Sequence, residues 1–226
     1  MVQKNRKPVR PVKSDAPVEP KRRGRPRAYE PQIAIGKALE LFRKGGFAAT
    51  SLDDLSAATG MNRPSLYGAF GDKRQLYIKS YQRYRDDARA AMIDIFREEL
   101  PIRKRLERIY AAALGIYLAG ETPRGCFTVM TAASEAVFDP EIRELVLEGF
   151  FELDKAFARC FRLAKEKGEL PATADAAVLA RLASATMHTM AIRARARVPR
   201  QELEAIVKGA IDLLCGGWQS NHWDLP

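Results

Sequence analysis

Apolar residues recur at intervals of three and four along almost the whole chain after residue 30, and the alternating runs typical of strands are not found. The pattern is clearest near the C-terminus, in Leu203, Ile206, Val207, Ala210, Ile211 and Leu214. It predicts helices over residues 31–45, 50–59, 62–70, 72–99, 103–119, 125–138, 139–167, 173–197 and 199–215. We therefore expect an all-α chain of about nine helices.

Capping residues mark where several of these helices begin. Thr50 and Asp53 have the spacing of a capping box, with aspartate in place of the usual glutamate, and Asp72 with Gln75 forms a second one. Asn62 is suited to cap the short helix between them. These signals place two short helices next to each other before a long one.

The positive charge of the chain is concentrated at its N-terminus. The formal net charge is +10, and residues 1–27 contribute +8 of it, with ten basic and two acidic residues. The same segment holds five of the 13 prolines and almost no large apolar residue, so it cannot bury enough surface to offset the entropy of ordering. We expect a disordered basic arm that binds a negatively charged partner.

Other classes of protein are disfavoured. No apolar window is long enough to span a membrane and no secretory leader follows Met1, so we expect a cytoplasmic protein with no membrane partner. Cys126, Cys160 and Cys215 have the spacing of neither a disulfide framework nor a zinc site, and we expect reduced thiols. Common catalytic and nucleotide-binding motifs are not found, so we expect no enzyme, no cofactor and no metal site.

Two short helices joined through Gly60 have the layout of a helix-turn-helix, in which the second helix enters the DNA major groove. The segment from Thr50 to Lys73 contains the glycine of the turn and the run Leu66-Tyr67-Gly68-Ala69-Phe70. With these features it closely resembles the helix-turn-helix of TetR/AcrR-type transcriptional regulators. The resemblance implies an N-terminal three-helix DNA-binding domain over residues 28–75.

The start of the second short helix carries candidates for reading DNA. Arg63 is interpreted as a free cation that can bind a guanine edge or a phosphate, and a solvated surface arginine is the alternative. Pro64, Ser65 and Gly68 are small enough to let the backbone approach the groove, and the Ser65 hydroxyl can bind a base or a phosphate.

The resemblance adds further contacts to the DNA backbone. It implies phosphate contacts from Thr50, Tyr67 and Lys73, the last at a helix N-terminus whose dipole favours anions. Ala69 stands where the family commonly has a histidine.

The basic arm contains a second candidate for DNA binding. Its run Arg23-Gly24-Arg25-Pro26 matches the core of the AT-hook, in which two arginines enter a narrow A/T-rich minor groove. A generic polybasic tether is the alternative for Arg23 and Arg25. Either way, we expect DNA affinity to fall steeply with salt.

Residues 76–216 are expected to form a larger helical domain, followed by a tail over residues 217–226. The resemblance implies that this domain dimerises and encloses a cavity for a small-molecule effector. Candidates for the dimer interface are Ala180, Ser184, Met187, Ala191, Leu203, Ile206, Val207, Ala210 and Leu214. Candidates for the cavity are Tyr117, Cys126, Phe127, Met130, Thr131, Phe151 and His188. For both groups, burial inside one subunit is the alternative.

One cavity candidate has a possible chemical role of its own. Cys126 follows Arg124 near a predicted helix N-terminus, an environment in which thiols become reactive. A redox or electrophile sensor is therefore one interpretation of this residue.

These features together favour a sequence-specific DNA-binding transcriptional regulator. The expected form is a homodimeric repressor that leaves a pseudo-palindromic operator of double-stranded DNA when an unidentified small molecule binds. The alternative is an architectural or weakly specific DNA-binding protein driven by the basic arm. The ratio of operator affinity to affinity for unrelated DNA distinguishes the two.

Overall fold

The computed structural model describes residues 30–120 and 122–216, and all regular secondary structure in these ranges is helical. The elements are α1 (Pro31–Ala49), α2 (Leu52–Thr59), α3 (Arg63–Phe70), α4 (Lys73–Arg97), α5 (Ile102–Tyr117), a π-helical segment (Thr128–Ala132), α6 (Ala133–Glu135), α7 (Pro140–Glu166), α8 (Ala176–Arg195) and α9 (Arg200–Leu214). The prediction of an all-α fold is confirmed. The predicted basic arm, with Arg23 and Arg25, and the predicted tail lie outside the described residues.

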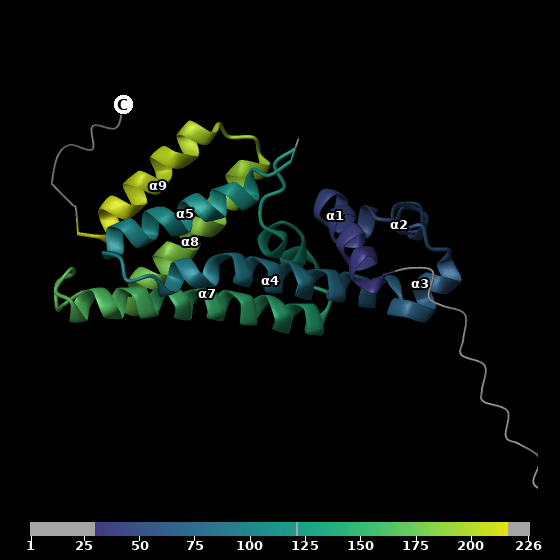
Figure 1. Cartoon of the computed structure of the whole chain (residues 1–226), viewed down its shortest axis with the longest axis horizontal. Helices are drawn as coiled ribbons and strands as arrows, with labels where there is room; N and C mark the ends of the chain where they lie inside the picture. Colours follow the sequence, from purple (N-terminus) through teal and green to yellow (C-terminus); the bar gives the residue numbers. More distant parts are fainter. Residues whose placement is uncertain (1–29, 121, 217–226) are drawn as a thin grey trace, which may run out of the picture.

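The three helices α1 to α3 lie at one end of the molecule, and α4 extends from that end along the helical body (Figure 1). Leu55 of α2 and Leu66 and Phe70 of α3 are buried, and they pack in one core with Phe42 of α1. This burial sets the angle between the helices, as their apolar spacing predicts.

Aromatic rings join the N-terminal half of α4 to the segment that follows α5. The ring of Phe127 is fully buried and meets Tyr77, Tyr81 and Tyr84 edge-on, with centroids 5.3, 5.6 and 5.7 Å away. The three tyrosines recur at intervals of four and three, so they lie on one face of α4. The edge-to-face arrangement adds to the stabilisation that burial of these rings provides.

The helical body is formed by α4, α5, α7, α8 and α9. Helix α7 runs beside α4 and also packs along α8 (Figure 1). The buried hydroxyl of Tyr110 on α5 donates to the carbonyl of Ala183 on α8 at 3.0 Å, which satisfies a polar group in this core. Within the described ranges, no helix is both long and apolar enough to cross a membrane.

The helix predicted over residues 125–138 is wrong at its beginning. Gly125 has a φ of 63°, and a Cβ placed on it would lie 2.6 Å from the carbonyl oxygen of Ala191. The φ and the close approach of α8 both require a glycine, so the chain is not helical at Gly125, and the π-helical segment begins at Thr128. The segment then forms a π-helical turn and the short α6.

Candidate DNA-binding surface and ligand cavity

The start of α2 is fixed by a capping box that lies one residue later than predicted. Ser51 Oγ accepts a hydrogen bond from the Asp54 amide at 3.1 Å, and the Ser51 hydroxyl and amide both donate to the Asp54 carboxylate and lower its pKa. The predicted pair of Thr50 and Asp53 is wrong as a cap. Thr50 is buried at the end of α1, where its hydroxyl donates to the carbonyl of Gly46 at 2.7 Å.

The turn into α3 follows the prediction. Gly60 ends α2 in the left-handed conformation with a φ of 73°, which suits a glycine. The side-chain oxygen of Asn62 accepts a hydrogen bond from the Ser65 amide at 2.9 Å and caps α3, and Pro64 lies in the first turn. The sequence thus folds locally into a short helix whose N-terminal end points away from the core.

The residues predicted to read DNA lie on the exposed side of α3. Arg63, Pro64, Ser65, Tyr67 and Gly68 are all exposed, and Tyr67 keeps 47% of its surface accessible. No atom lies within 4 Å of the position that a Cβ on Gly68 would take. A second molecule can therefore approach the backbone of α3 closely at this residue.

Arg63 is not the free cation that the sequence analysis expects. Its Nε and Nη2 donate to Oδ1 of Asp53 at 3.0 and 2.7 Å, and Nη2 also lies 2.7 Å from Oδ2. Asp53 comes from the first turn of α2, so the turn between the helices brings the two groups together. The fork of donors on Arg63 is occupied by an intramolecular carboxylate in the free chain.

Lys73 and Thr50 form an internal contact at the base of the helix-turn-helix. The Lys73 ammonium group donates to the Thr50 carbonyl at 2.8 Å and lies 4.3 Å from the ring centroid of Phe47. This contact connects the start of α4 to the junction of α1 and α2. Lys73 remains partly exposed.

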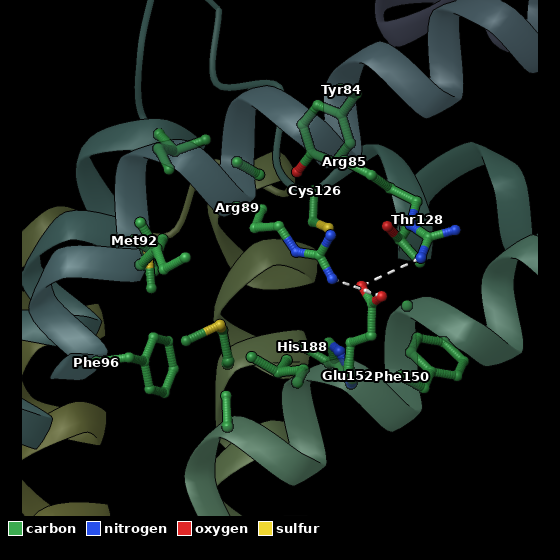
Figure 2. Close-up of a pocket in the computed structure, with 18 of the residues that line it drawn as sticks. Tyr84, Arg85, Arg89, Met92, Phe96, Cys126, Thr128, Phe150, Glu152 and His188 are labelled. Atoms are coloured by element: carbon green, nitrogen blue, oxygen red, sulfur yellow. Dashed lines mark hydrogen bonds and ion pairs between the residues drawn. The ribbon is translucent and has the colours of Figure 1, made fainter. Parts of the chain in front are cut away.

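A cavity of about 490 Å³ lies in the helical body between α4, α5, α7, α8 and the segment before the π-helical turn. Its volume falls within the range of small-molecule sites, about 300–1,000 Å³. Three of the predicted cavity residues line it: Tyr117, and also Cys126 and His188, which are labelled in Figure 2.

The other four cavity candidates lie elsewhere. Phe127 is buried against the tyrosines of α4, and Thr131 is buried with its hydroxyl on the carbonyl of Phe127 at 3.0 Å. Met130 is partly buried beside Gly125 and does not line the cavity. Phe151 is 58% exposed on α7, because its neighbour Phe150 takes the inward position on that helix.

Sequence reasoning missed the wall that α4 contributes. Arg85, Arg89, Met92 and Phe96 line the cavity from this helix. They follow one another at intervals of four, three and four, which is the spacing of one helical face. That spacing was available in the sequence, and two arginines on an otherwise apolar face are the signal that distinguishes it from an ordinary core stripe.

Burial favours the neutral forms of Tyr84, Tyr117 and His188 in the cavity wall. It raises the pKa values of Tyr84 and Tyr117 well above the ordinary tyrosine value, and it lowers the pKa of His188, although Asp154 opposes this shift. The ring of His188 lies 5.0 Å from that of Phe150, and no hydrogen bond to it is found among the described residues. A neutral imidazole with free hydrogen-bonding capacity thus borders the cavity.

Cys126 has surroundings different from those expected. It is buried in the cavity wall, while the neighbouring Arg124 forms an ion pair with Glu40 of α1. The arginine that was expected to stand beside the thiol is therefore directed to another helix.

Two family models match this chain. One, described as bacterial regulatory proteins of the tetR family, matches residues 34–79, and a tetracyclin repressor-like C-terminal domain matches residues 103–210. The two matches cover the helix-turn-helix and most of the helical body. The chain belongs to the TetR family. It is therefore a DNA-binding transcriptional regulator, as the resemblance of its helix-turn-helix implies.

Individual TetR-family relatives agree with this assignment. The HTH-type transcriptional repressor ComR of Escherichia coli (strain K12) is 29% identical over 187 residues, which cover 82% of this chain and 89% of ComR. The repressor BdcR of the same organism is 31% identical over 125 residues, 55% of this chain and 62% of BdcR. A solved structure of a cysteine mutant of the regulator CifR, complexed with a 26-base-pair operator, has a TM-score of 0.74 and 28% identity, and covers 83% of this chain and 98% of that one.

Hydrogen bonds connect the cavity wall of this TetR-family chain to its DNA-binding end. Arg195, two turns after His188 on α8, donates to the carbonyls of Arg43 and Lys44 near the end of α1 at 2.7 and 2.9 Å. Arg43 in turn donates to the carbonyl of Gly125, beside Cys126, at 3.3 Å. Two segments that line the cavity are thus attached directly to α1, which packs against the helix-turn-helix.

The candidates for the dimer interface lie mostly inside the chain. Seven of them are buried: Ala180, Ser184, Met187, Ala191, Leu203, Val207 and Leu214. Ile206 and Ala210 are partly buried. The candidates on α8 are buried because this face of the helix packs on α5 and α7 of the same chain. The exposed apolar residues of α8 are on another face, at Val178, Leu182 and Ile192, and α9 exposes Leu213.

Proposed function

We propose that the chain is a homodimeric repressor that a small molecule releases from a pseudo-palindromic operator. The observation that supports release is the attachment of the cavity wall to α1 through Arg195 and Arg43. A molecule that fills the cavity and displaces α8 or the segment at Cys126 acts on the carbonyls near the end of α1. A ligand that prefers one arrangement of these elements shifts the population toward it.

DNA contact is assigned to the exposed side of α3 and to the residues around it. Arg63 and Ser65 are proposed to reach base edges or phosphates, and Tyr67 a phosphate, while Pro64 and Gly68 permit close approach. The ammonium group of Lys73 is proposed to exchange the Thr50 carbonyl for a phosphate, which gives Thr50 a positioning role. Arg23 and Arg25 remain proposed contacts of the arm in the minor groove.

The homodimer is proposed to form through the exposed apolar face of α8. Val178, Leu182 and Ile192 lie on one side of this helix, since Leu182 and Ile192 follow Val178 by four and fourteen residues, each about 40° from a whole number of turns. Aliphatic residues aligned in this way are typical of a surface that another helix covers. Two chains joined there would present two copies of α3 to successive major grooves, about 34–36 Å apart.

Footprinting of the full-length chain on an operator obtained by selection from random duplexes tests this function. We expect a protected inverted repeat whose half-sites lie about one helical turn apart. Protection of a single site without symmetry would contradict a dimeric reader.

Two further measurements test release and specificity. A metabolite that raises the melting temperature of the chain should also release the operator. A specificity ratio near one would instead favour the weakly specific binder that the +8 arm suggests.

A further inference from the structure

The charged side chains that line the cavity are mostly cations. Arg85 and Arg89 come from α4, and Glu152 and Lys155 come from α7. Figure 2 shows the Glu152 carboxylate between the two guanidinium groups, with Oε1 2.6 Å from Nη2 of Arg89 and Oε2 3.2 Å from Nη2 of Arg85. The lining thus holds three cations and one carboxylate, and Lys155 has no ion pair among the described residues.

A further carboxylate, outside the cavity lining, holds Arg85. Glu148 forms an ion pair with Arg85 at 3.2 Å, and it borders a neighbouring depression together with Asp86. Neither Glu148 nor Asp86 lines the cavity itself. Arg85 is paired with two carboxylates, Glu148 and Glu152, whereas Arg89 has only Glu152, which it shares with Arg85. The excess positive charge facing the cavity therefore rests on Arg89 and Lys155.

The remainder of the cavity wall is apolar. Met92, Phe96, Ile116, Phe150 and Leu153 line it, and Figure 2 shows Met92 and Phe96 away from the charged group. A ligand that buries its hydrocarbon part against these side chains is stabilised in proportion to the apolar area removed from water. The site therefore separates a charged region from an apolar one.

We propose that the molecule bound in this cavity is an apolar monocarboxylate, whose carboxylate accepts hydrogen bonds from Arg89 and Lys155. This inference rests on the proposed role of the cavity as the effector site. A cationic ligand would meet three cations and would need to displace both arginines from Glu152. A carboxylate can bind between Arg89 and Lys155 without breaking the pair of Arg85 and Glu148, and it adds charge-assisted hydrogen bonds.

Three probes that share one aromatic body test the charge preference: naphthylacetate, naphthylethanol and naphthylethylamine. Their affinities for the full chain are measured by calorimetry. We expect Arg89→Ala and Lys155→Ala each to weaken naphthylacetate about fivefold, the change that corresponds to about 1 kcal/mol for an exposed charge pair, and to leave naphthylethanol unchanged. Glu152→Gln is expected to strengthen naphthylacetate, because it removes the carboxylate that competes for Arg89. Arg97→Ala, an exposed arginine of α4 outside the cavity, is the matched control.

Cavity-filling variants separate the ways in which the inference can fail. Ala156→Phe and Ile93→Trp, both at partly exposed positions of the lining, should abolish binding of all three probes. If binding is lost in these variants but the charge variants do not change the preference among probes, the anion preference is wrong and the effector cavity stands. If no probe binds, or if filling the cavity has no effect on binding, the anion preference and the assignment of the effector cavity are both wrong. If naphthylacetate binds there and never shifts operator affinity, the cavity takes a carboxylate but the proposed release is wrong.

Discussion

Replacement of Asp53 by asparagine tests how Arg63 meets DNA. In the free chain the Asp53 carboxylate accepts from both Nε and Nη2 of Arg63, at 3.0 and 2.7 Å, so this pair of donors cannot bind a phosphate at the same time. Both side chains are more than half exposed, with 54% and 76% of their surfaces accessible. Water and salt screen the pair, and DNA can compete for the guanidinium group. The asparagine keeps the size of the side chain and removes its charge.

We expect Asp53→Asn to bind unrelated DNA more tightly and with a steeper dependence on salt. Arg63, once released, gains about one phosphate contact per chain, and each such contact to duplex DNA changes the slope of log K against log salt by about −0.9. On the operator the gain should be smaller if, as proposed, a base edge replaces Asp53 as the partner of Arg63 there. The specificity ratio should therefore fall while total affinity rises.

Fluorescence anisotropy over a series of salt concentrations, with a selected operator and a scrambled duplex, measures both slopes. Glu202→Gln makes the same change of charge on α9, far from α3 in the chain, and serves as the control. An unchanged slope in Asp53→Asn would contradict the assignment of Asp53 as a competitor. The same increase in a chain that also carries Arg63→Ala would show that Asp53 acts on DNA directly.

Four more outcomes follow from single features. Phe127→Ala removes a fully buried ring and should lower the free energy of unfolding by about 3–5 kcal/mol in chemical denaturation; Phe138→Ala, at a residue 85% exposed, should change it by less than about 0.5 kcal/mol. Arg195→Ala should leave ligand binding intact but reduce ligand-induced operator release, and unchanged release would exclude this contact as the connection. Because burial lowers the pKa of His188, the unfolded chain binds that proton more tightly, so stability is retained above the ordinary histidine pKa and falls as pH drops below it. His188→Gln should lose less stability than the parent between about pH 7 and pH 5, and parallel curves would contradict this. Deletion of residues 1–27, with their net charge of +8, should flatten the salt slope by up to about 7 and keep operator preference; loss of preference with an unchanged slope would show that the arm reads the sequence.

The fold could be predicted because each helix has its own local signals. The caps at Asn62 and Asp72 depend on a side chain and an amide three residues later, so neighbouring residues alone determine them. The cap of α2 shows where this reasoning ends. Thr50 with Asp53 and Ser51 with Asp54 have the same spacing, and only the burial of Thr50 at the end of α1 decides between them.

The cavity was only partly predictable, since periodicity does not distinguish a face that lines a cavity from one that packs in a core. Tyr117, Cys126 and His188 are among the residues predicted for the cavity and do line it. Phe151 was predicted by the same reasoning, but it is exposed. Phe150 and Phe151 are adjacent, so the sequence pattern does not show which of the two faces inward. Contacts between distant segments decide which of two adjacent residues faces inward, and the spacing of residues along the chain carries no information about those contacts.

Helix α8 shows the same ambiguity at the level of assembly. Its small residues, such as Ala180 and Ala191, permit close packing, and a partner chain or a helix of the same chain could use that closeness equally well. They are buried against their own chain, where Gly125 allows the backbone to approach Ala191. A helix that is apolar on a second face, at Val178 and Leu182, has a surface left over after the core is complete. The proposed dimer surface is therefore made of the residues that remain exposed and not of those that pack most closely. Replacing Leu182 with glutamate should dissociate the proposed dimer without unfolding the chain, as sedimentation and circular dichroism together can show.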